Sequence, residues 1–256
     1  MCIRDSVGGR YADISQAHDL RLETAMEIHS AWGTFEWLLT DGFPLGHRSG
    51  VVCNSDGHKG RPGASFPGAV TFGAYGGLTC FLTNDLTRDG IFECLRSRHH
   101  YGTTGCRMHL EVKVHFKEQA IFYHQDPKAY RDPGTSKVRE VMMGDIVETG
   151  ENEVMLSLKI LGHAPLERVE IRNGSEVCSI HRPFDASDLG SRIRVIWSGA
   201  EYRGRGRQTF WKGRADFQHC RILKMKKINA WNHEKRLQTC GTVSYTHLTL
   251  PTICSV

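Results

Sequence analysis

The residues best suited to chemistry in this 256-residue chain form a glycine-rich loop, residues 54–63, with the sequence NSDGHKGRPG. The loop places the carboxylate of Asp56 and the imidazole of His58 two positions apart, just after residues 50–53, an apolar run that is typical of a short buried strand. Carboxylate oxygen and imidazole nitrogen both bind divalent cations. The pattern therefore predicts half of a metal-dependent hydrolytic site at the end of a strand.

Two cationic side chains follow in the same loop. Lys59 and Arg61 are expected to hold an anionic, phosphate-like oxygen of a substrate beside the metal. An Asp-x-His pair is short enough to occur by chance, however, and the alternative is a solvated turn in which Asp56 caps its own backbone and His58 is incidental. The residues before the loop help to decide between a metal site and a solvated turn.

A strand and a helix are predicted upstream of the loop. Residues 25–28 are short and mostly apolar, which is typical of a buried strand, and His29 follows at its C-terminal end. Thr34 is then expected to cap a helix with one apolar face. That face carries, at helical spacing, Phe35, Leu38, Leu39 and Phe43. With residues 51–53 as the next strand, the pattern predicts a β-α-β unit with parallel strands.

Parallel strands of one unit end at the same edge of a sheet, which is where barrel enzymes keep their chemistry. His29 is therefore expected to converge with Asp56 and His58 as a third metal ligand. A core histidine that bonds to the backbone is the alternative for His29. Glu27 and Glu36 are rival ligands, but they are less well placed.

Long and distinctive motifs lie in this part of the chain: EIHSAWGTFEWLL, GVVCNSDGHKGRPGASFPGA, FGAYGGLTCFLTNDLTR and LRSRHHYGTTGCR. In these residues the chain closely resembles a domain-of-unknown-function family of the PHP superfamily, which is named after polymerase and histidinol phosphatase. The resemblance covers most of residues 7–241. It implies an α/β fold, the C-terminal part of a distorted (β/α)7 barrel, and a cluster of divalent metal ions (Mn, Zn or Fe) used mostly for phosphoester hydrolysis.

The resemblance also implies roles for individual residues. The last metal motif of the superfamily is an Asp-x-His, which matches Asp56 and His58, and His29 is the best-placed candidate for the single ligand that precedes it. Tyr101 and Arg107 are expected to line the substrate site, because the resemblance is strong around them.

Other ligands of the superfamily are missing. Its members open with a His-x-His motif, whereas only His18 precedes Met26 here. Each ion needs about four to six donors, so three ligands cannot hold a metal cluster. The end sequences MCIRDS and VSYTHLTLPTICSV resemble translated sequencing-adaptor DNA. We therefore expect a C-terminal fragment of a hydrolase that is inactive alone, and the lost N-terminus leaves export open.

The second half of the chain is expected to be rich in β-strands. Alternating apolar residues run through residues 108–116, 154–160 and 193–197, and Asn173-Gly174 is a strong hairpin signal. These patterns predict an antiparallel β-sandwich-like domain. We expect a partial barrel in residues 7–125, a linker in residues 126–134 and a β-rich domain in residues 135–241. The end segments, residues 1–6 and 242–256, are expected to be sequencing artefacts.

A basic stretch suggests a different function. Residues 192–227 contain eleven Lys or Arg and two acidic residues, with RGRGR followed by Phe210 and Trp211. Such a stretch is typical of a single-stranded nucleic-acid binder, whose charges contact phosphates and whose rings stack on bases. A solvated sheet face is favoured over this alternative, since the net charge of the chain is only +5. A non-catalytic interaction module is a third possibility.

Composition sets outer limits on these functions. The chain is 39% hydrophobic and 24% charged, as is ordinary for a globular protein, and no apolar run approaches a membrane span, so no membrane partner is expected. Nine scattered cysteines without a Cys-x-x-Cys motif are expected to be mostly buried or free thiols, which slightly favours the cytoplasm.

Overall fold

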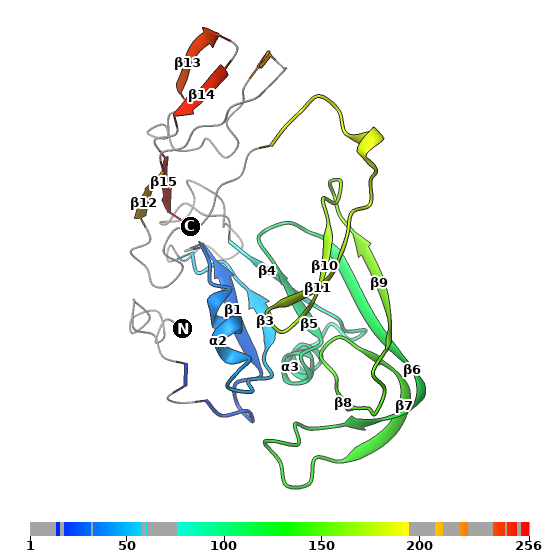
Figure 1. Cartoon of the computed structure of the whole chain (residues 1–256). Coiled ribbons are helices and arrows are strands. Elements are labelled where there is room, and N and C mark those ends of the chain that lie inside the picture. Colours follow the sequence, from blue (N-terminus) through cyan, green and yellow to red (C-terminus); the bar gives the residue numbers. More distant parts are fainter. Residues whose placement is uncertain are drawn as a thin grey trace. The chain divides into compact units, whose positions relative to one another are not determined.

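The computed structural model describes residues 14–15, 18–31, 33–57, 60, 76–194, 208–211, 221–224, 238–243, 245–249 and 252–255. The chain divides into two compact units, of which one is Asp13–Val195 and the other combines Met1–Ala12 with Ile196–Val256. Figure 1 shows the helices and strands of the described residues. The residues expected to do chemistry all belong to the first unit.

The first sheet contains the predicted parallel strands. It has the order β2-β1-β3, formed by β1 (Ala25–Ser30), β2 (Gly33–Thr34) and β3 (Gly50–Cys53). β1 and β3 run parallel, with Ala25 opposite Gly50, and helix α2 (Trp37–Gly42) lies between them in sequence. The predicted β-α-β unit is thus confirmed.

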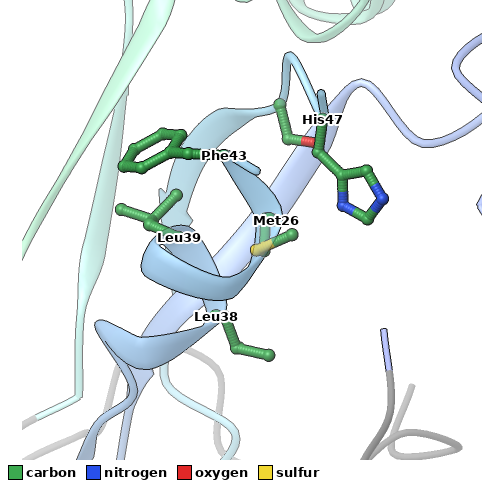
Figure 2. Close-up of a pocket in the computed structure, with 7 residues that line it drawn as sticks. Met26, Leu38, Leu39, Phe43 and His47 are labelled. Carbon is green, nitrogen blue, oxygen red and sulfur yellow. The ribbon is translucent and has the colours of Figure 1, made fainter. Parts of the chain in front are cut away.

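The predicted start of the helix is wrong. Thr34 belongs to β2, where it lies opposite His29, and α2 begins after Glu36 without a side-chain cap. Trp37 is buried, whereas Phe43 is 42% exposed, so the apolar face differs from the predicted one. A small pocket lies between α2 and the first half of β1 (Figure 2). Among the residues that line it are Met26, Leu38, Leu39, Phe43 and His47.

The next elements overturn the predicted barrel. Strands β4 (Leu78–Phe81) and β5 (His100–Thr103) are joined through helix α3 (Arg88–Ser97), but they pair antiparallel, with Leu78 opposite Thr103. A (β/α)7 barrel instead continues the parallel direction after each helix. Among the described residues the sheets are small and no barrel is present, so the prediction of a PHP-type (β/α)7 barrel is wrong.

Helix α3 follows the sequence closely. Its N-cap is Thr87, whose hydroxyl oxygen accepts a hydrogen bond from the backbone N–H of Gly90 (3.1 Å). It ends at Arg98, which adopts a left-handed conformation with φ of 63°. Phe92 on this helix is 61% exposed.

A curved antiparallel sheet forms the largest element of the unit. The 15-residue strand β6 (His109–Tyr123) pairs with β7 (Thr135–Met142) on one side, and with β8 (Ile146–Glu148) and β9 (Met155–Leu161) on the other. The core of this sheet consists of Phe116 and Ala120 in β6 and Val141 in β7, which are buried. Partly buried hydrophobic side chains pack around them. The alternation predicted for residues 108–116 and 154–160 is confirmed as strands.

The predicted hairpin is also present, but the sandwich is not. β10 (Val169–Asn173) and β11 (Glu176–His181) pair antiparallel around a turn in which Gly174 has φ of 58°. A short 3-10 helix, η1 (Ala186–Asp188), follows. The hairpin is a separate two-stranded sheet, so the described residues contain a curved sheet and a hairpin in place of a β-sandwich. The alternation of side chains predicts strands, but it does not predict how the strands combine into sheets.

The second unit contains two antiparallel pairs in its described residues. β12 (Gln208–Trp211) pairs with β15 (Thr252–Ser255), and β13 (Gln238–Val243) pairs with β14 (Tyr245–Thr249). Strands β14 and β15 fall in residues 242–256, the end segment expected to be an artefact. Most of the basic stretch 192–227 lies outside the described residues.

Several polar contacts fasten the curved sheet to the elements before it. Arg48 donates to the carboxylate of Asp126 (2.7 Å), and the guanidinium of Arg96 donates to the hydroxyl of Tyr130 (3.1 Å). Residues 126–134, expected to be a linker, therefore pack against the first part of the unit. No helix in the described part of the chain has both the length and the apolar character of a membrane span.

Candidate functional site

The C-terminal ends of β1 and β3 lie side by side (Figure 1). The backbone N–H of Asn54 donates to the carbonyl of His29 (3.1 Å), and the N–H of Ala31 donates to the carbonyl of Ser55 (3.1 Å). These two bonds continue the pairing of the strands past the end of β3. They hold the chain before Asp56 against the end of β1, as the sequence predicted.

His29 is buried at this edge, with 6% of its surface exposed. Its Nδ1 atom lies 2.8 Å from the hydroxyl oxygen of Thr34, its cross-strand neighbour in β2. The pairing of β1 with β3 contains a register shift between Glu27 and His29, and such a bulge re-aims the side chains of a strand. One nitrogen of the imidazole is thus held by an oxygen atom.

Asp56 is half-buried in the loop that leaves β3. Its backbone has φ of 43°, a left-handed conformation that aspartate tolerates better than most residues because its short polar side chain bonds locally. Asp56 and His29 come from adjacent strand ends. The other residues predicted for this loop, His58, Lys59 and Arg61, lie outside the described residues.

A network of side chains holds the loop in place. The amide of Asn54 donates to the carboxylate of Glu27 (3.0 Å) and lies 3.3 Å from the hydroxyl of Thr79. Thr79 in turn accepts from the N–H of Cys53 (3.0 Å) and donates to its carbonyl (2.9 Å). The carboxylate of Glu27, expected to be a less well placed ligand, therefore lies near the loop, where it contacts Asn54.

Cys53, the last residue of β3, is buried and packs closely against two glycines. A Cβ atom on Gly102 would lie 2.2 Å from its Sγ atom, and a Cβ on Gly77 would lie 2.4 Å from its Cβ, so only glycine fits at either position. Burial, together with the nearby charge of Glu27, raises the pKa of the Cys53 thiol to about 11. Cys53 is therefore a neutral packing residue at neutral pH.

The five described cysteines, Cys53, Cys80, Cys94, Cys106 and Cys178, are all free thiols. Cys53 and Cys94 are buried, and Cys178 is exposed. The prediction of mostly buried or free thiols is confirmed for these five.

The two residues predicted to line a substrate site occupy different environments. Tyr101 is buried, and its hydroxyl donates to the carbonyl of Met108 (2.7 Å) and accepts from the N–H of Leu110 (3.1 Å). Burial, helped by contact with Cys80, raises the pKa of Tyr101. Arg107 is exposed in the segment between β5 and β6. Tyr101 thus orders the backbone that leads into β6.

The adjacent histidines after α3 have structural partners. Nε2 of His99 lies 2.7 Å from the carboxylate of Asp145, and Nδ1 of His100 lies 2.9 Å from the carbonyl of Val51 in β3. Burial lowers the pKa of His100, which favours the neutral imidazole. The partners of His99 and His100 lie 46 and 49 positions away in the sequence. Contacts between residues so far apart do not produce a local sequence pattern, so the sequence did not predict them.

His29 and Asp56 are residue types that bind divalent cations such as Mn, Zn or Fe. The imidazole of His29 is buried with one nitrogen beside an oxygen, and Asp56 follows the neighbouring strand end. Within the described residues these donors do not form a group of three His, Cys, Asp or Glu side chains. The predicted third ligand, His58, lies outside them.

Comparisons of the chain with protein-family models, with curated proteins and with solved structures find no match.

Proposed function

We propose that this chain carries part of a metal-dependent hydrolytic site, phosphoesterase-like, in which His29, Asp56 and His58 bind a divalent metal ion. The observation that supports the proposal most is the parallel pairing of β1 with β3, which brings His29 and the loop before Asp56 to one edge. The resemblance of the motifs around these residues to a family of the PHP superfamily supports phosphoester hydrolysis as the reaction class.

Each group has a distinct role in this proposal. A bound metal ion lowers the pKa of a water molecule and polarises a phosphoryl oxygen. His29, Asp56 and His58 hold the ion, and the cationic side chains of Lys59 and Arg61 bind the anionic oxygens of the substrate. Three donors satisfy less than the full coordination of one ion, which is about four to six. We therefore expect the chain to bind metal without efficient turnover.

Metal content tests the binding half of the proposal. The purified full chain is incubated with Mn²⁺, Zn²⁺ or Fe²⁺, desalted and analysed for bound metal by mass spectrometry. We expect stoichiometric retention of one of these metals, strongly reduced in Asp56→Ala and in His58→Ala. His163→Ala, a change at an exposed histidine, is the matched control and retains the metal. Equal retention by all four proteins would exclude the proposed ligands.

Turnover tests the catalytic half. A chromogenic phosphoester is supplied with Mn²⁺, and hydrolysis by the chain is compared with hydrolysis by His58→Ala. We expect both rates to be close to background, because the donor set is incomplete. A rate far above that of His58→Ala would show that the chain forms a complete catalytic site by itself and would refute the expected inactivity.

A further inference from the structure

Thr34 is placed opposite His29 by a tight reversal of the chain. The two residues form a cross-strand pair of β1 and β2, and the reversal passes through Gly33, whose φ of 125° is accessible to glycine. The backbone N–H of Phe35 donates to the carbonyl of Ile28 (2.6 Å) and closes the reversal. The backbone pairs Ser30–Gly33 and Ile28–Phe35, which flank His29 and Thr34, therefore hold the Thr34 hydroxyl next to His29.

The contact acts on a buried ring. His29 is 6% exposed, and its Nδ1 atom lies 2.8 Å from the Thr34 hydroxyl oxygen. A neutral imidazole has one N–H group and one nitrogen with a lone pair, and only the nitrogen with the lone pair binds a metal. The position of the proton thus decides whether Nδ1 or Nε2 carries the lone pair.

We infer that Thr34 is a positioning residue, whose hydroxyl oxygen accepts the Nδ1–H of His29 and so places the lone pair of the ring on Nε2, the nitrogen that would bind a divalent cation. This inference rests on the proposed metal site. Histidine ligands of metals usually donate their other N–H to an oxygen, which fixes the ring and its protonation. Thr34 supplies that oxygen here, a role that a helix cap does not have.

The protonation of His29 gives a readout that needs neither metal nor activity. The full chain is labelled with ¹⁵N-histidine, and the ring nitrogens of its 14 histidines are observed by long-range ¹H–¹⁵N correlation, with the His29 signals assigned from His29→Gln. We expect protonated Nδ1 and unprotonated Nε2 in the wild-type chain. Thr34→Ser keeps the hydroxyl and preserves this pattern, whereas Thr34→Val, of nearly the same shape, shifts His29 toward the Nε2–H form. An Nε2–H form of His29 in the wild-type chain would overturn the inference.

Zinc affinity supplies the second readout. Calorimetric titration with Zn²⁺ is expected to show affinity about 10–100-fold weaker in Thr34→Val and close to wild type in Thr34→Ser, since removal of such an outer partner has effects of this size. Circular dichroism and thermal unfolding of both variants show whether the fold is retained. If the wild-type chain and Thr34→Val bind zinc equally, the positioning role is wrong while the metal site stands. If the wild-type chain binds no zinc, the proposed metal site itself fails, whatever the protonation of His29.

Discussion

At the scale of single residues, the edge that carries His29 and Asp56 depends on how closely Cys53 is packed. Gly102 has no room for a side chain, because an added Cβ would meet the Cys53 Sγ atom at 2.2 Å. We expect Gly102→Ala to lower the free energy of unfolding by about 1–3 kcal/mol, as is typical of overpacking. Gly150→Ala, where an added Cβ has no neighbour within 4 Å, is expected to change it by no more than about 0.5 kcal/mol. Urea unfolding measures both, and equal effects would contradict this packing.

The raised pKa of Cys53 makes a second prediction at this scale. The pKa of the Cys53 thiol is about 11 in the folded chain, against an ordinary value of 9.0. Because the folded chain binds the thiol proton more tightly than the unfolded chain does, this difference stabilises the folded state fully below pH 9. This contribution, on the order of 2–3 kcal/mol, is lost as the pH rises from about 9 to about 11. The difference in unfolding free energy between the wild-type chain and Cys53→Ala should therefore shrink over that range. A difference that stays constant up to pH 11 would show that the thiol is not shielded.

Sequence reasoning located part of the candidate site and missed its support. The spacing of two apolar runs around a helix predicted that His29 and the Asp56 loop leave neighbouring strands. Thr34 was expected to cap α2, because a threonine before an apolar helical pattern is a common cap signal. Gly33 instead allows a reversal that turns Thr34 back onto His29, and a contact set by backbone pairing leaves no trace in helical periodicity.

At the scale of elements, some hydrophobic side chains of the curved sheet form a small core, whereas those of β9 are largely exposed to solvent. Phe116 in β6 is 6% exposed, whereas Leu158 in β9 is 39% exposed. Truncation of a buried aromatic side chain costs about 3–5 kcal/mol, and we expect this loss in Phe116→Ala. Leu158→Ala should cost about 1 kcal/mol or less, because much of its side chain remains in water when folded. Urea unfolding ranks the two variants, and a larger loss for Leu158→Ala would contradict the position of the core.

The errors in fold prediction also belong to this scale. Alternating apolar residues identified β6 and β9, and the Asn173-Gly174 turn signal identified the β10–β11 hairpin. These patterns did not show that the chain returns through α3 in the opposite direction, so that β4 and β5 form an antiparallel pair in place of consecutive barrel strands. Nor did they show that β6 is long enough to pair with β8 and β9 along the same side. Direction and partner depend on long-range contacts, which the local pattern does not encode.

At the scale of the whole unit Asp13–Val195, polar contacts connect the β1–β3 sheet to the curved sheet. The Asp126 carboxylate is 4% exposed and is bonded to Arg48 and to the backbone N–H of Lys128. Arg48→Leu leaves a buried carboxylate without its cation, and we expect a loss of about 3 kcal/mol. Arg131→Leu, at an exposed position in the same segment, is the control and should change little.

The unfolding curve of Arg48→Leu also tests whether the unit is cooperative. We expect a single transition that moves to lower denaturant concentration in this variant, because the contacts of Asp126 join the two sheets. A curve with two transitions, of which only one moves, would show that the sheets unfold independently.

We propose that His29, Asp56 and His58 bind the same cation, and X-ray absorption of the zinc-loaded full chain identifies the atoms that surround it. We expect a first shell of nitrogen and oxygen at about 2.0–2.1 Å, with outer scattering from two imidazole rings that falls by about half in His29→Ala. A shell dominated by sulfur at about 2.3 Å would place the metal on cysteines and would rule out these three ligands.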